Sequence, residues 1–186
     1  MSATLNTSYV NHQLGDLGAV YSRRELALTE KDWDFLAKPS EKEFFANRRV
    51  GSRLNSYHFE DDPAATARTR DILQKLEPWL SVHVPDAERL ALATAQFNKM
   101  DRGHSVGRHV DVNSNGSWGL PLVLVFMLEA AKHGGDFVVY QSGSKPISFV
   151  MPDRSLLMLK SDVEHSVSMV KQGARASVVM RLERDG

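Results

Sequence analysis

The chain has 186 residues, of which 42% are hydrophobic and 25% charged, a composition typical of a soluble globular protein with one domain. Its 23 basic and 23 acidic residues balance, so no net charge favours nucleic acid, a membrane surface or another polyanion as partner. The absence of cysteine excludes a disulfide framework and a thiolate metal site. The N-terminus lacks the basic start and apolar core of a signal peptide, and the longest apolar run, 120–128, is too short to span a bilayer, so we expect a cytoplasmic protein.

Helices are expected in the first part of the chain, after a polar and aperiodic start over residues 1–20 that predicts a flexible or loosely docked segment. Thr29 can cap a helix, with Asp32 as its capping-box partner three residues later. A second short helix is expected after Ser40, with Phe45 inside it.

The strongest helical pattern begins at Asp62, where Pro63 occupies the first turn, a position at which its missing N–H costs nothing. Apolar residues then recur at helical spacing as far as Leu80. Between these helices, the polar stretch 48–58 has no helical period, which is typical of either a strand or a lid loop.

From Leu90 onward, short apolar runs alternate with turns rich in Gly, Pro, Asn and Asp, a pattern that indicates strands. We expect eight strands, at residues 90–100, 105–112, 120–129, 135–141, 146–150, 155–160, 163–170 and 175–183. Eight short strands at this spacing predict a sandwich or a jelly-roll barrel. The chain is therefore expected to be mainly β with N-terminal helices, a single domain in which residues 1–85 support a core formed by residues 86–186.

The β region contains the only His-x-Asp of the sequence, formed by His109 and Asp111. On a strand, residues two positions apart point to the same face, so both side chains can reach one metal ion. His165, on the expected strand 163–170, is the best candidate for a third ligand. Two histidines and one carboxylate on one side of an ion leave the opposite positions open, which suits non-haem Fe(II) and oxygen chemistry.

The last expected strand carries polar residues on one face. Alternation places Arg175, Ser177 and Val179 on that face and a wholly apolar set on the other, which should pack against the helices. The polar face would then point into the barrel. A buried arginine needs a partner, and a guanidinium beside a hydroxyl makes a good receptor for a carboxylate.

Five residues together resemble the motif set of the Fe(II)/2-oxoglutarate-dependent dioxygenases: His109, Asp111, His165, Arg175 and Ser177. The resemblance covers roughly residues 90–182, and the segments Gln96-Phe97-Asn98 and Gly134-Gly135-Asp136-Phe137 are closest to the prolyl-hydroxylase-like branch. It implies a double-stranded β-helix, a jelly roll, in agreement with the number of expected strands.

The resemblance also implies a role for each residue. The iron ligands would be His109, Asp111 and His165. Arg175 would bind the distal carboxylate of 2-oxoglutarate with help from Ser177. Because the segment 124–128 lacks the tyrosine that many members of this branch place near the cosubstrate, Asn98 or Lys99 would take that part. With Fe(II), 2-oxoglutarate and O2, and ascorbate as a supporting reductant, such an enzyme oxidises a C–H bond while 2-oxoglutarate is decarboxylated to succinate.

Several functions stay open at this point. A small molecule is the expected substrate, a peptidyl (prolyl-type) substrate is the alternative, and the balanced charge disfavours nucleic acid. A jelly-roll sensor that binds metal without turnover, or a zinc hydrolase, could use the same ligands. The histidines could also be ordinary core residues, with Arg175 paired to Asp111 for structural reasons. Nothing in the sequence indicates the oligomeric state.

Three further features have weaker functional interpretations. His58 and Glu60 have a metal-like spacing, but no third ligand is evident. Trp118, in the polar loop after the metal strand, could face a substrate or plug the rim of the barrel. Arg108 should point outward, because it precedes His109 on the same strand, or else line the entrance of the barrel.

Overall fold

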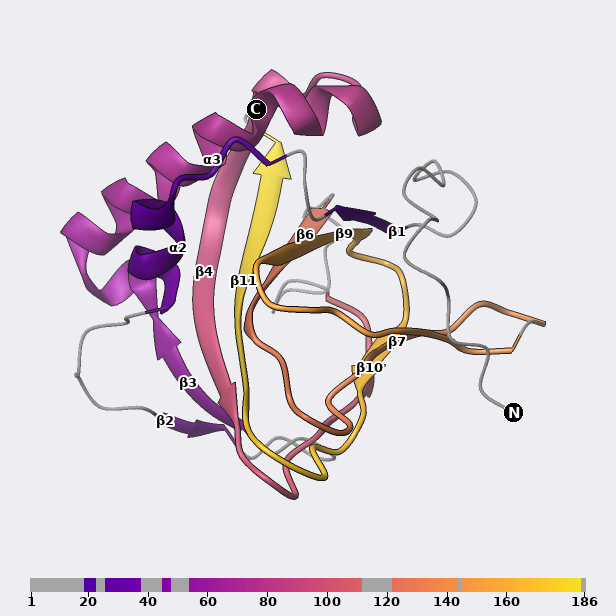
Figure 1. The fold of residues 1–186 in the computed structure, drawn as a ribbon. Helices are drawn as coiled ribbons and strands as arrows, with labels where there is room; N and C mark the ends of the chain where they lie inside the picture. The colour runs from indigo at the N-terminus through magenta and orange to yellow at the C-terminus, as the bar shows by residue number, and fades with distance from the viewer. Residues whose placement is uncertain are drawn as a thin grey trace.

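The computed structural model describes residues 19–22, 26–37, 45–47, 54–111, 122–143 and 145–184. Two antiparallel sheets face each other, and two helices lie on the outer side of the larger sheet (Figure 1). Over the described residues the two sheets are not hydrogen-bonded into one closed barrel. This arrangement confirms the expected jelly-roll class, mainly β with helices near the N-terminus. None of the described helices is both long and apolar enough to cross a membrane.

The larger sheet has seven strands. In sheet order they are β1 (Ala19–Ser22), β9 (Ser155–Lys160), β6 (Leu122–Glu129), β11 (Arg175–Arg184), β4 (Leu90–Met100), β3 (Leu54–His58) and β2 (Phe45–Asn47). The smaller sheet has four, in the order β5 (Val106–His109), β10 (His165–Val167), β7 (Phe137–Val139) and β8 (Ile147–Phe149). All eight strands expected after Leu90 are therefore present, most of them shorter than expected, because turns and bulges end the pairing early.

The two helices, α2 (Glu30–Ala37) and α3 (Pro63–His83), begin where the sequence predicted, after Thr29 and after Asp62. The Thr29 amide donates to Asp32 Oδ2 at 2.8 Å, and the Asp32 amide donates to Thr29 Oγ1 at 3.3 Å, which is a reciprocal capping box. Asp62 Oδ1 accepts from the amides of Ala64 and Ala65 at the start of α3. Single 3₁₀ turns, η1 (Phe59–Asp61) and η2 (Ala87–Arg89), flank α3.

Asp32 also joins the two helices. Its side chain is fully buried and accepts hydrogen bonds from Arg68 at 2.7 Å and from Lys75 at 2.8 Å, both on α3. Burial opposes the charge, but the hydrogen bonds from Lys75 and Thr29 outweigh burial and lower the pKa of Asp32 to about 2. The helix pair is thus held by a buried ionic cluster as well as by apolar packing.

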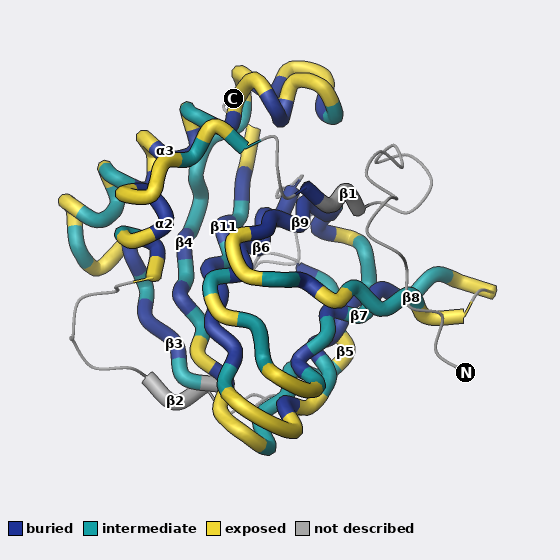
Figure 2. Tube along the Cα trace, in the orientation of Figure 1, coloured by how far each residue is buried: buried dark blue, intermediate teal, exposed yellow. Residues whose placement is uncertain are grey.

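Two apolar layers form the core, one on each side of the larger sheet, and Figure 2 shows β6 and β9 buried along most of their length. The outer layer lies under the helices and includes the predicted apolar face of β11: Ala176, Val178, Met180 and Leu182. The inner layer lies between the two sheets, and Val179 packs against it. The predicted assignment of the faces of β11 is confirmed, so Arg175 and Ser177 point between the sheets.

The structure corrects two expectations for the first part of the chain and describes only part of a third segment. Phe45 lies in strand β2, paired with Ser56 of β3, so the short helix expected around it is wrong; strand pairing overrides a weak local helical pattern. Residues 19 and 20, at the end of the segment expected to be flexible or loosely docked, belong to β1, which pairs with β9; residues 1–18 lie outside the described residues. Of the polar stretch 48–58, residues 54–58 form β3, and the remainder lies outside the described residues.

Candidate metal centre

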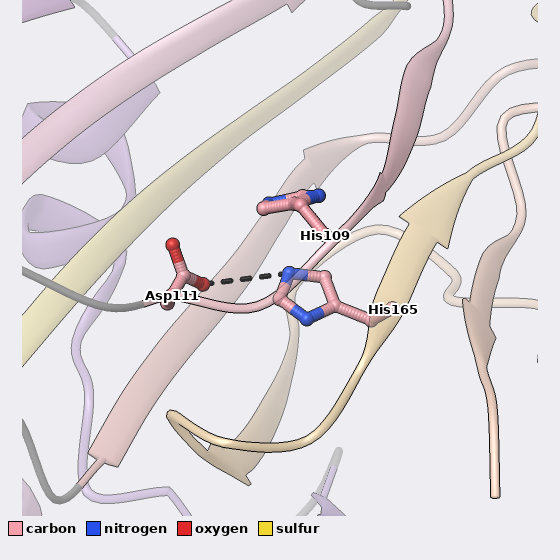
Figure 3. A group of neighbouring side chains, drawn as sticks. All are labelled: His109, Asp111 and His165. Carbon is pink, nitrogen blue, oxygen red and sulfur yellow. Dashed lines mark ion pairs between the residues drawn. The ribbon is translucent and has the colours of Figure 1, made fainter. Parts of the chain in front are cut away.

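The two histidines of the predicted triad lie opposite each other on adjacent strands. His109 ends β5, His165 begins β10, and the two residues are partners in the antiparallel register. Asp111 follows β5 directly, and its amide donates to Ser161 O at 3.0 Å. One ligand atom from each of these three residues lies within 4.8 Å of the others, and the side chains converge in Figure 3. The structure therefore brings together the three residues that the sequence predicted as ligands.

Backbone carbonyls determine which nitrogen of each histidine faces this point. His109 Nδ1 lies 2.8 Å from Gly107 O, and His165 Nδ1 lies 2.9 Å from Val163 O. A carbonyl oxygen can only accept, so each Nδ1 carries the hydrogen and each Nε2 presents a lone pair. Burial lowers the pKa of His165 below its ordinary value, which favours this neutral form.

The neutral histidine faces a carboxylate without a hydrogen between them. His165 Nε2 and Asp111 Oδ2 are 3.4 Å apart (Figure 3), and both side chains are buried. A lone pair and an anionic oxygen repel each other, and a cation between them would be attracted to both. The donor set, two imidazoles and a carboxylate, is the one that non-haem Fe(II) uses with open positions. The residues therefore fit a divalent metal.

Arg181 binds the other oxygen of Asp111, an interaction that sequence reasoning missed. Its Nε and Nη2 donate to Asp111 Oδ1 at 3.0 and 2.8 Å. Burial opposes ionisation of Asp111 most strongly, but the charge of Arg181, its hydrogen bonds and the two nearby histidines together outweigh burial and hold the pKa of Asp111 below its ordinary value. The alternation along β11 placed Arg181 on the same face as Arg175 and Ser177, so a signal for it was present in the sequence.

Arg175 is buried between the two sheets, and its guanidinium makes few hydrogen bonds. It is 2% exposed, and its Nη1 donates to Ser177 Oγ at 2.8 Å and lies 3.9 Å from Met100 Sδ. Its Nε and Nη2 are buried and have no partner among the described residues. Burial lowers the pKa of Arg175 to about 10, so it still carries its charge at neutral pH. Because Asp111 is paired with Arg181, the structural Arg175–Asp111 pair considered above is wrong.

A polar row runs along the inner face next to Ser177. Asn98 of β4 is its register partner, while Lys99 is exposed and shares the outer face with Ala176. Asn98 Oδ1 accepts from Gln96 Nε2 at 2.7 Å and from Ser56 Oγ at 3.2 Å, and both donors come from this same inner face. Of the two candidates left open by the sequence, Asn98 therefore lies beside the Arg175–Ser177 pair and Lys99 does not.

The other candidates lie apart from this centre. His58 and Glu60 pair with each other at 3.1 Å on the surface, and the described residues place no third ligand beside them. Arg108 is exposed as expected; it pairs with Glu164 and lies 4.3 Å above the Tyr140 ring. Trp118 lies outside the described residues.

Comparisons with known proteins show a shared fold despite low sequence identity. No family model matches the sequence, and no curated protein is significantly similar to it. Among solved structures, a 2OG-Fe(II) oxygenase family oxidoreductase from Burkholderia pseudomallei superposes with a TM-score of 0.79 at 17% identity, over 94% of this chain and 89% of that one. This chain has the fold of the 2OG-Fe(II) oxygenases.

Two further structures with this fold differ in what their names say they do. A Pseudomonas putida prolyl-4-hydroxylase matches with a TM-score of 0.66 at 15% identity, over 93% of this chain and 96% of that one. The non-haem alpha-ketoglutarate-dependent epimerase SnoN from nogalamycin biosynthesis matches with a TM-score of 0.62 at 10% identity, over 92% and 80% of the two chains. The predicted resemblance, including that to the prolyl-hydroxylase-like branch, is thus confirmed in the fold.

Proposed function

We propose that this protein is an Fe(II)/2-oxoglutarate-dependent oxygenase. The observation that carries the proposal is the Arg175 guanidinium, which is buried between the two sheets and has two nitrogens that no described residue binds. Buried N–H donors without an acceptor are costly, and a bound ligand that accepts from them removes this cost. A carboxylate that accepts two parallel hydrogen bonds would complete a guanidinium.

His109, Asp111 and His165 would hold the iron through the two Nε2 atoms and Asp111 Oδ2. The iron, once bound with 2-oxoglutarate and O2, supplies the oxidising chemistry, with decarboxylation of 2-oxoglutarate to succinate. The two backbone carbonyls that hold the histidine Nδ1 atoms keep both rings in the orientation that this requires.

Arg175, Ser177 and Asn98 would bind the distal carboxylate of 2-oxoglutarate. Ser177 Oγ accepts from Arg175, so its own hydroxyl hydrogen is free to donate to a ligand. Asn98 Oδ1 already accepts two hydrogen bonds, which directs its Nδ2 donors toward the remaining open side. The apolar inner layer around these groups, including Met100 and Val167, excludes water and strengthens each polar contact.

A small molecule is the substrate that we propose, with hydroxylation or a related oxidation of a C–H bond as the reaction. Support comes from the neutral composition of the chain and from SnoN, whose name places it in the biosynthesis of nogalamycin. The similarity to a prolyl-4-hydroxylase favours a peptidyl substrate as the second candidate. A metal-binding sensor or a zinc hydrolase would leave the unpaired Arg175 guanidinium without a role.

Anaerobic titration of 2-oxoglutarate into the Fe(II)-loaded protein tests the proposal. We expect the weak visible charge-transfer band of a chelated 2-oxo acid, and we expect Arg175→Ala to lose it at the same ligand concentration. Arg108→Ala is the matched control, because this arginine is exposed and pairs with Glu164 away from the inner face. Bound iron without a band in the unsubstituted protein would contradict the oxygenase and favour a sensor.

A further inference from the structure

The three candidate ligands differ in how the fold holds them. Each histidine is oriented by a carbonyl two residues earlier in its own chain segment, Gly107 O for His109 and Val163 O for His165. Among the described residues the Asp111 side chain has no such local partner, and its hydrogen bonds come from Arg181, 70 residues further along the chain. The orientation of the carboxylate therefore depends on a residue of another strand.

The geometry of this contact leaves the two carboxylate oxygens in different states. An arginine often binds a carboxylate side by side, with one N–H to each oxygen. Here both donors converge on Oδ1, at 3.0 Å from Nε and 2.8 Å from Nη2. Oδ2 is left facing His165 Nε2 at 3.4 Å, while Oδ1 points away from that ring (Figure 3).

Burial helps to keep Oδ1 bound to Arg181 and Oδ2 free of it. Asp111 is 6% exposed and Arg181 has a side chain that is 26% exposed, so water competes little for Oδ1. Oδ1 already accepts two charge-assisted hydrogen bonds and would have to lose them to reach a metal. A carboxylate free of such a partner can bind a metal through one oxygen or through both.

We propose that Arg181 is a positioning residue that restricts Asp111 to a single metal-binding oxygen, Oδ2. The inference rests on the metal site of the proposed function and concerns the number of positions that the protein itself fills. A second oxygen from Asp111 would occupy one of the positions that two histidines and one carboxylate otherwise leave open for ligands. Arg181 thus belongs to the site without touching the metal, from the strand that also carries Arg175.

Binding of Mn(II) to the full chain, in the absence of 2-oxoglutarate, is the first measurement. For Arg181→Gln we expect the affinity to fall roughly 10- to 100-fold, as for other residues that orient a metal ligand. Arg181→Lys keeps the charge but not the pair of N–H groups, so it should restore part of the affinity. Arg108→Gln, an exposed arginine next to His109 in sequence, should bind Mn(II) as the unsubstituted protein does.

The absorption spectrum of Co(II) at saturation is the second measurement, because it reports coordination and not affinity. We expect a changed spectrum in Arg181→Gln and an unchanged one in Arg108→Gln. A purely structural ion pair would instead lower the melting temperature of the metal-free variant and leave Mn(II) affinity and the Co(II) spectrum unaltered, which would overturn the proposal. If Arg181→Gln does not fold, the same comparison is made with Arg181→Lys, and values equal to those of the unsubstituted protein would overturn it.

The two proposals fail in different ways. Loss of Mn(II) affinity in Arg181→Gln, together with no 2-oxoglutarate band in the unsubstituted protein, would support the role of Arg181 and contradict the oxygenase. A band in the unsubstituted protein, with unaltered metal binding in the variant, would do the reverse.

Discussion

His109 and His165 are register partners on neighbouring antiparallel strands, and their ring centroids lie 4.3 Å apart. Residues that face each other across two antiparallel strands share one face of the sheet, so this pairing alone directs both imidazoles to the same point. The Phe137 ring stacks on His165 from the next strand at 5.0 Å and restricts its rotation. The smaller sheet therefore preorganises two of the three candidate ligands before any metal binds.

Removal of one of these imidazoles should remove the stabilisation by metal. A ligand that binds only the folded state at 100 times its Kd stabilises by about 2.7 kcal/mol, which raises the melting temperature by several degrees. We expect this rise with Mn(II) in the unsubstituted protein and none in His165→Ala at the same concentration. His133→Ala is the control, since His133 is exposed outside the centre, and its rise should match that of the unsubstituted protein.

Replacement of Arg175 by methionine should separate stability from binding. The substitution removes a buried guanidinium with two unpartnered nitrogens and adds apolar volume next to Met100, so the metal-free protein should be as stable as before or more stable by about 1–3 kcal/mol. The variant should lose binding of 2-oxoglutarate. Urea denaturation and the anaerobic titration measure the two effects, and a large loss of stability would show that the guanidinium has a structural partner.

Acid should weaken the contact between the helices through Asp32. Its pKa is about 2 in the folded protein against 3.8 for an unperturbed aspartate, so the folded state binds the proton less readily than the unfolded state. This difference contributes about 2 kcal/mol to the free energy of unfolding above pH 4, and the contribution is lost as the pH falls from about 4 to about 2. Asp32→Asn should lower stability at pH 7 and flatten this part of the pH profile, as measured by urea denaturation between pH 2 and pH 7.

Gly134 should tolerate no side chain, whereas Gly143 should tolerate one at modest cost. Both have left-handed backbones, with φ of +71° and +73°, so alanine costs about 1–2 kcal/mol at either position. A Cβ at Gly134 would also lie 2.0 Å from Met169 O, while a Cβ at Gly143 would meet nothing within 4 Å. We expect Gly134→Ala to destabilise by about 1–3 kcal/mol more than Gly143→Ala in thermal or urea unfolding. Equal losses would mean that the backbone near Met169 moves aside.

The triad and the guanidinium were predictable because local spacing carries the information. Side chains alternate along a strand, which put Arg175 and Ser177 on one face of β11, and the His-x-Asp spacing indicated two neighbouring ligands although Asp111 lies just after the end of β5. The same alternation predicted the apolar outer face of β11, which packs under the helices. The caps of both helices were equally local, because each joins residues no more than three positions apart.

Short local patterns did not predict secondary structure or side-chain neighbours correctly where these depend on pairing with a strand distant in the sequence. Phe45 sits in a strand and not in a helix because β3 offers its backbone a partner. The choice of Asn98 over Lys99 depended on the register between β4 and β11, and a shift of one residue would have reversed it.

By itself the sequence indicated the candidate metal ligands, the inward face of β11 and the mainly β architecture, because motif spacing, strand alternation and regularly placed turns are all local features of the chain. Only the tertiary structure decided how those ligands are held. The nitrogen that each histidine presents follows from a carbonyl position, and the oxygen that Asp111 presents follows from Arg181. Contacts such as that between Arg181 and Asp111 join residues up to 70 positions apart. They depend on strand register and bulges, which cannot be predicted from the local alternation of side chains.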